Sequence, residues 1–147
     1  MGGMVDVSQK PEIFRSALAR GKIFLNEESI RRIKEGRVEK GDPLEVARVA
    51  AILAAKKTPE IIPHCHPIPI THVGIEFRVE EDGVTVEARV TGVARTGVEM
   101  EALTAVSVAL LTIWDMVKKY EKDERGQYPR TEIAGIRVVE KIKGGGV

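Results

Sequence analysis

Residues 73–90, VGIEFRVEEDGVTVEARV, decide the fold. Apolar residues occupy every second position in 73–79 and again in 84–90, with glycine, threonine or charged residues between them. Such alternation is typical of strands that have one buried face and one face in water. The Asp82-Gly83 pair between the two runs is typical of a two-residue hairpin turn. We therefore predict two half-buried antiparallel strands joined by a tight turn.

Two helices are predicted ahead of this hairpin. Asn26 stands before two acidic residues and Gly36 ends the pattern, which predicts a short helix over 27–35. Asp42 and Pro43 supply a cap and a first-turn proline for a second, mostly apolar helix. This second helix should end near Lys57, because a Thr-Pro pair follows.

One long helix is predicted after the hairpin. Residues 96–99, TGVE, resemble a capping box that opens a helix over about 98–120. Of the 18 residues from Met100 to Val117, 13 are apolar, which is typical of a helix in a core or at a subunit interface. Its polar residues Glu101, Thr104, Thr112 and Asp115 fall on one narrow stripe at 100° per residue.

The remaining segments complete an α+β order. Residues 61–70 contain three prolines, which predicts a rigid extended loop, and 133–142 has the pattern of a last strand. With a strand placed ahead of the first helix, the order becomes β-α-β-β-α-β, an antiparallel sheet packed against helices. We expect a single domain over 1–147 with flexible ends at 1–3 and 144–147.

Composition narrows the class of protein. The chain of 147 residues is 43% apolar and 31% charged, so it can bury a core and is not a disordered chain. Its formal net charge of +1 argues against a nucleic-acid binder. The sequence predicts no membrane span and no signal peptide, and its one cysteine fits a reducing compartment. We therefore expect a soluble, cytoplasmic protein.

The stretch Pro63-His64-Cys65-His66-Pro67 suggests either a metal site or a rigid binding loop. Successive side chains of an extended segment point to opposite faces, so adjacent residues rarely converge on one ion. His72 could complete a histidine set, but its spacing is not diagnostic. A proline-stiffened loop that presents His66 and backbone amides to a small ligand is favoured, and structural histidines remain the alternative.

The long helix carries candidate residues at both ends. Asp115 and Lys118 lie three residues apart and can share a pocket as an acid/base pair, although a solvated ion pair is equally compatible with the spacing. Glu99 occupies a capping position, whereas Glu101 leads the polar stripe. Glu101 and Asp115 are separated by about 21 Å at ~1.5 Å per residue. Either the ligand is long or two subunits contribute opposite ends of this helix.

Four basic residues are candidates for phosphate neutralisation. Lys40 precedes a predicted helix start, where anions bind favourably. Lys56, Lys57 and Arg95 are further candidates, although the residues alone favour a solvated charge at each of them. No phosphate-loop motif accompanies them.

Several stretches stand in the order of one family: MVDVS at 4–8, KGD at 40–42, AAKKT at 54–58, IPHCHP at 62–67 and TGVEMEALTA at 96–105. LTIWDM at 111–116 continues the match through Lys118. Over residues 4–143 the chain resembles the molybdenum cofactor biosynthesis protein C family, the cyclic pyranopterin monophosphate synthases. The resemblance implies a ferredoxin-like fold and a homohexamer, a trimer of dimers, with the active site at a subunit interface.

The resemblance also implies the reaction. The family converts 3′,8-cyclo-7,8-dihydro-GTP to cyclic pyranopterin monophosphate and diphosphate, as a phosphorus–oxygen lyase. It requires no redox cofactor, and Mg²⁺ would come only with the triphosphate. Carried over by motif, the catalytic residues are Asp115, Lys118 and Lys40. The residues expected to bind substrate are His64, Cys65, His66, Glu99, Met100, Glu101, Arg95 and Lys56, with no metal ligands among them.

Two departures from the family pattern concern this site. His64 stands where leucine is usual, so the contact there would come from the backbone. Arg95 replaces a usual lysine, which keeps the charge and changes the donor geometry. Two other classes remain as alternatives: an oligomeric binding module without catalysis, and a metal-dependent hydrolase built on His64, His66 and His72.

Overall fold

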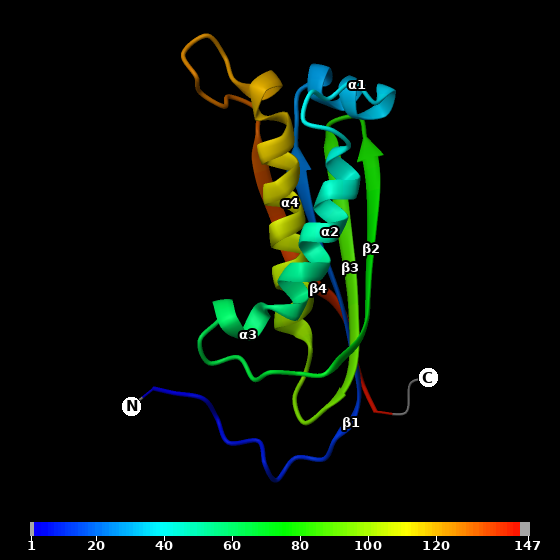
Figure 1. Cartoon of the computed structure of the whole chain (residues 1–147), viewed down its shortest axis with the longest axis vertical. Coiled ribbons are helices and arrows are strands. Elements are labelled where there is room, and N and C mark those ends of the chain that lie inside the picture. The colour runs from blue at the N-terminus through cyan, green and yellow to red at the C-terminus, as the bar shows by residue number, and fades with distance from the viewer. Residues whose placement is uncertain (1, 145–147) are drawn as a thin grey trace.

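The computed structural model describes residues 2–144, so Met1 and 145–147 of the expected flexible ends lie outside the described residues. Figure 1 shows an elongated α+β domain in which helices cover one face of a sheet. The elements follow one another as β1 (Ile13–Phe24), α1 (Glu27–Glu35), α2 (Pro43–Lys56), α3 (Thr58–Ile61), β2 (Ile70–Glu80), β3 (Gly83–Ala94), α4 (Glu99–Glu121) and β4 (Glu132–Lys143).

The four strands form one antiparallel sheet in the order β2-β3-β1-β4. This confirms the predicted β-α-β-β-α-β architecture, with β2 and β3 as the hairpin. The turn differs from the prediction by one residue, because Glu80 pairs with Gly83 and the loop is Glu81-Asp82. Gly83 is needed for a different reason: a Cβ there would overlap the carbonyl oxygen of Ile23 on β1. The glycine therefore serves the close approach of two strands rather than the turn.

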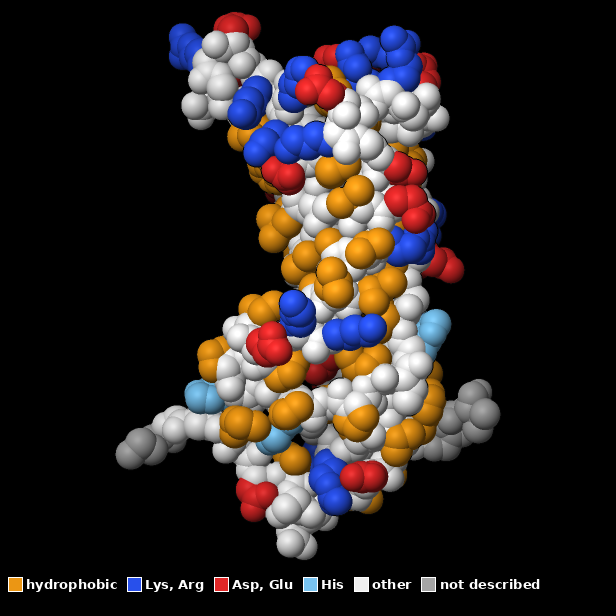
Figure 2. All heavy atoms as spheres, viewed as in Figure 1, with side chains coloured by type: hydrophobic (Ala, Val, Ile, Leu, Met, Phe, Trp, Pro, Cys, Tyr) orange, Lys and Arg blue, Asp and Glu red, His pale blue; other side chains and the backbone are white. Residues whose placement is uncertain are grey.

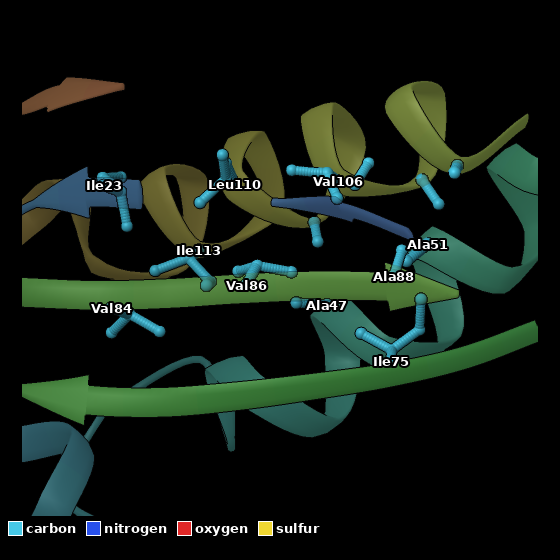
Figure 3. Packing of buried hydrophobic residues seen from close by; sticks show 14 of the residues in the cluster. Ile23, Ala47, Ala51, Ile75, Val84, Val86, Ala88, Val106, Leu110 and Ile113 are labelled. Atoms are coloured by element: carbon cyan, nitrogen blue, oxygen red, sulfur yellow. The ribbon is translucent and has the colours of Figure 1, made fainter. Parts of the chain in front are cut away.

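The core lies between the sheet and the pair α2 and α4. Figure 3 shows Val84, Val86 and Ala88 of β3 directed toward the helices, where they meet Ile113 of α4 and Ala47 of α2. All five side chains are fully buried. The alternating apolar residues of the hairpin therefore form the face of the sheet that packs against the helices, as predicted.

β1 faces α4 with small residues. Ala17 and Ala19 are fully buried, and Gly21 follows on the same face. A Cβ at Gly21 would lie 2.8 Å from Leu110 Cδ1 and 2.9 Å from Val106 Cγ1. These distances are shorter than van der Waals contact, so the absence of side chains lets the helix lie close to the strand.

The boundaries of α1, α2 and α4 agree with the sequence within one or two residues, whereas the short helix α3 was not predicted and one predicted cap is wrong. Asn26 caps α1 by accepting the Ser29 N–H at 2.9 Å, and Asp42 caps α2. The capping box predicted from Thr96 is wrong, because Val98 is the N-cap of α4 and provides no side-chain bond. The side chain of Glu99 instead pairs with Lys141 of β4, with Oε2 3.2 Å from Nζ.

The C-terminal end of α4 is fastened to its neighbours by a buried carboxylate. Glu121 is 3% exposed and accepts hydrogen bonds from Ser29 Oγ, from Thr131 Oγ1 at 2.6 Å and from the Asn26 N–H at 3.0 Å. One side chain thus joins α4 to the start of α1 and to the segment before β4. Without Glu121, the groups that donate to it would be buried and unpaired, so these hydrogen bonds stabilise the end of the helix.

α4 is also long and apolar enough to span a membrane by length and composition. It lies against the sheet and α2, and residues such as Ala105, Ala109 and Val117 along it are fully buried. It is therefore a core helix of this domain.

Candidate functional site

The structure brings together the three residues predicted to be catalytic. Asp115 and Lys118 lie on the last turns of α4, and Lys40 lies in the loop before α2. Asp115 Oδ1 is 3.0 Å from Lys118 Nζ, and Asp115 Oδ2 is 3.2 Å from Lys40 Nζ. Lys40 Nζ also donates to the backbone carbonyl of Asp115 at 3.1 Å. We refer to these residues as the Lys–Asp–Lys cluster.

Charged hydrogen bonds stabilise the ionised forms of Asp115 and Lys118 in this cluster. Hydrogen bonds from Lys118 and then from Lys40 lower the pKa of Asp115 below its usual 3.8. The hydrogen bond to Asp115 raises the pKa of Lys118 above its usual 10.5. The Lys118 side chain is 42% exposed, so its carboxylate partner determines the direction of this shift. The cluster thus carries two cations around one anion, which suits an anionic ligand.

A second group lies at the opposite end of α4. Cys65, in the proline-rich loop 62–69, donates its thiol to Glu101 Oε2 with a sulfur–oxygen distance of 3.6 Å. Glu101 is 1% exposed, and its other oxygen, Oε1, has no hydrogen-bond partner among the described residues. Burial raises the pKa of Glu101 above its usual 4.5. Desolvation, and then the charge of Glu101, raise the pKa of the Cys65 thiol to about 11.

We refer to Cys65 and Glu101 as the thiol–carboxyl pair. A buried carboxyl oxygen without a partner is costly, since it has lost its water without gaining a donor. Glu99, one position before Met100 on the same turn, also has a buried oxygen without a partner. Such oxygens are suited to accept hydrogen bonds from a ligand that enters between the loop and the helix.

The other predicted binding residues are distributed around this second end. Met100 is 40% exposed, and His64 is exposed in the loop. His66 Nε2 lies 2.6 Å from the carbonyl oxygen of Val5. Lys56 is exposed at the end of α2, and its side chain makes no hydrogen bond or ion pair among residues 2–144.

The histidines do not assemble into a metal site. Residues 2–144 contain no group of three or more His, Cys, Asp or Glu side chains placed to hold an ion. His66 instead binds the N-terminal segment, and His72 lies against Gly74 of β2. The proposed hydrolase site on His64, His66 and His72 therefore lacks the geometry it needs.

The family model described as MoaC family matches residues 4–144, which is nearly the whole chain. The chain belongs to the MoaC family. Membership confirms the resemblance read from the sequence.

MoaC-family relatives are similar over almost their full length. A probable cyclic pyranopterin monophosphate synthase of Sulfurisphaera tokodaii is 61% identical over 95% of this chain and 93% of its own length. Proteins with the same description from Pyrococcus furiosus and Methanococcoides burtonii are 59% and 57% identical over 95% of the chain, and 90% and 88% of their own lengths are covered. The predicted enzyme class, a cyclic pyranopterin monophosphate synthase of molybdenum cofactor biosynthesis, is thereby confirmed.

Sequence reasoning missed Arg15 in this MoaC-family chain. Arg15 on β1 is only 3% exposed, and its guanidinium donates to the backbone carbonyls of Ala94 at 3.0 Å and Arg95 at 3.1 Å. No carboxylate of the described residues forms an ion pair with it. A buried cation without a counter-ion favours an anionic ligand nearby. The residue sits in an irregular Ala- and Arg-containing stretch, which has no motif to single it out.

Proposed function

We propose that this chain converts 3′,8-cyclo-7,8-dihydro-GTP to cyclic pyranopterin monophosphate and diphosphate, with the Lys–Asp–Lys cluster as its acid/base centre. The observation that carries this is the carboxylate of Asp115 held between Lys118 and Lys40 at 3.0 and 3.2 Å. Opening one ring, closing another and forming a cyclic phosphate all require proton transfers. The cluster can supply them without a redox cofactor.

The two lysines suit different parts of this chemistry. A protonated Lys118, whose pKa is raised by its bond to Asp115, is ready to donate a proton to a leaving atom. Lys40 adds positive charge where negative charge develops on departing diphosphate. We propose that no cofactor is needed beyond any Mg²⁺ that arrives with the triphosphate, and that the enzyme is cytoplasmic.

We further propose that the complete site forms between two subunits of a homohexamer built as a trimer of dimers. The Lys–Asp–Lys cluster and the thiol–carboxyl pair lie at opposite ends of α4, about 21 Å apart at ~1.5 Å per residue. Between them, Figure 2 shows apolar side chains gathered over α2 and α4. Val49, Leu53 and Leu111 are between 50% and 58% exposed there.

This apolar surface supports a two-fold contact. A two-fold axis across α4 would reverse the helix in the partner and would set the Asp115 end of one chain beside the Glu101 end of the other. The same contact would cover the exposed apolar side chains, which is favourable at about 25 cal/mol per Å². Each dimer would then contain two equivalent sites.

Turnover of the purified protein on the tricyclic nucleotide tests the reaction, with product read as the fluorescent oxidised pterin. Lys118→Ala and Asp115→Asn should each lose about a hundredfold or more in kcat. Lys119→Ala is the matched control, because this neighbouring lysine pairs with Glu39 instead of Asp115. A folded wild-type protein without turnover would overturn the reaction and leave a binding module.

Mixing two inactive variants tests the shared site. Lys118→Ala and Glu101→Gln damage opposite ends of α4, so a mixed dimer would hold one doubly damaged site and one intact site. When equal amounts of the two variants exchange subunits at random, half of the dimers are mixed, and half of the sites in each mixed dimer are intact. About a quarter of the wild-type activity should therefore return. If each chain contains its own complete site, mixing restores nothing.

A further inference from the structure

The N-terminal segment 4–12, which we name the strap, contacts the loop 62–69 at His66 and does not join the sheet. It contains no helix or strand, and all of its residues except Val7 are exposed. Its internal bonds are local: the Ser8 N–H donates to Asp6 Oδ1 at 2.9 Å, and the Lys10 N–H donates to the Val7 carbonyl at 3.0 Å. A segment with so little buried apolar surface depends on its polar attachments for its order.

Two side chains make every hydrogen bond and ion pair that joins the strap to the rest of residues 2–144. His66 binds the Val5 carbonyl at one end of the strap. Arg95 holds the other end: Nη1 donates to the carbonyls of Ser8 at 3.2 Å and Lys10 at 2.8 Å, and Nη2 lies 3.6 Å from Glu12 Oε1. One guanidinium therefore fixes three points of the strap.

Arg95 is itself held by the core. It follows directly after β3, and its carbonyl accepts the bond from the buried guanidinium of Arg15. This places the Arg95 side chain firmly at the end of the sheet, where its planar fork can reach several acceptors. A cavity of about 160 Å³ lies beneath the strap, lined by Val7 and Glu12 from one side and by His66, Arg95 and the prolines of the loop from the other.

We propose that Arg95 is a positioning residue: it fastens the strap, and the strap holds the His66 imidazole in place through the Val5 carbonyl. Because a carbonyl only accepts, this bond commits the Nε2 proton of His66 and fixes the direction of the ring. Arg95 thus acts on the substrate through the strap and His66. This role rests on the proposed function and on the substrate contact that the family resemblance implies for His66.

Amide hydrogen exchange in the full-length protein tests the attachment without any reference to activity. In Arg95→Ala the strap amides should exchange about tenfold faster than in the wild type, since charge-assisted bonds at three points are lost. Arg95→Lys keeps the charge but has a single nitrogen, so it should give an intermediate rate. Arg31→Ala, a matched change at an exposed arginine of α1, should leave the strap unchanged. Unchanged strap exchange in Arg95→Ala would overturn the proposal.

Kinetics test whether the effect passes through the strap. Arg95→Ala should raise KM about tenfold with little change in kcat, because binding geometry is lost rather than proton transfer. Val7→Ser loosens the same segment at its half-buried apolar residue. If both substitutions act through the strap, the KM of the double variant should be little higher than that of the more affected single variant.

If the increase in KM of the double variant instead equals the product of the two single increases, Arg95 touches the substrate directly. That result would overturn the positioning role. A wild-type protein without turnover would refute the proposed function, whereas the exchange measurement would still decide whether Arg95 fastens the strap.

Discussion

The thiol of Cys65 should react unusually slowly, and its pH dependence measures the environment of Glu101. Its pKa is raised from 9.0 to about 11 by desolvation and by the neighbouring carboxylate. At pH 8 a rise of two pKa units leaves about a hundredfold less thiolate. A more basic thiolate is intrinsically more reactive, by roughly sixfold to tenfold over two units at a Brønsted slope of ~0.4–0.5. The net expectation is a reaction about tenfold slower than that of an unhindered cysteine.

An aromatic disulfide reagent provides the assay, because the chain has one cysteine and the released thiolate is counted directly. The logarithm of the rate should keep rising with pH up to about 11 in the folded protein, and should level off near 9 in urea. Circular dichroism at each pH checks that the fold persists.

Two variants separate the causes of the raised pKa. Glu101→Gln removes the charge that faces the sulfur, so it should lower the pKa of Cys65 and speed the reaction at pH 8. Glu99→Gln removes a carboxylate from the same turn without touching the thiol, so it should change the rate little. A rate that levels off near pH 9 in the folded wild type would refute this account of the pair.

Four further outcomes are expected. Glu121→Gln should lower the free energy of unfolding by about 3 kcal/mol, since buried donors lose a charged acceptor, and calorimetry should show a Tm about 6–12 °C lower. Gly21→Ala should cost about 1–3 kcal/mol in chemical denaturation, because the added carbon overlaps α4. The pKa of Asp115 is lowered and that of Lys118 raised, so neither should produce a limb in kcat/KM between about pH 5 and 9. The raised pKa of Cys65 means that the unfolded chain loses this proton first, so stability should fall as pH rises from 9 toward 11.

Local patterns predicted most of the fold, because the signals that identify the hairpin and the helices lie within a few residues. The alternation in 73–90 predicts the β2–β3 hairpin, and Asn26 and Asp42 cap α1 and α2 as predicted. β1 was harder, since Ala17, Ala19 and Gly21 face the core in place of the branched residues that identify strands.

The site could be predicted only in part. Asp115 and Lys118 are helix neighbours, so their pairing follows from spacing alone. Lys40 reaches the same carboxylate from 75 residues away in the chain, a contact that only tertiary packing creates. The partner of Cys65 and the attachment of the strap by Arg95 are likewise long-range, and no local pattern in the sequence specifies them.

The small residues of β1 have a consequence for how this sequence can change. Both ends of α4 carry groups proposed for the reaction, and the position of the helix is set by contact with a nearly bare strand at Gly21. In most sheets a change to valine or isoleucine is among the best tolerated. On the inner face of β1, valine and isoleucine should instead be among the least tolerated residues. Each added methyl group would push α4 away from the sheet and displace both of its ends together. A map of tolerated substitutions would therefore show this strand as the most restricted part of the sheet, although none of its alanines or glycines takes part in chemistry.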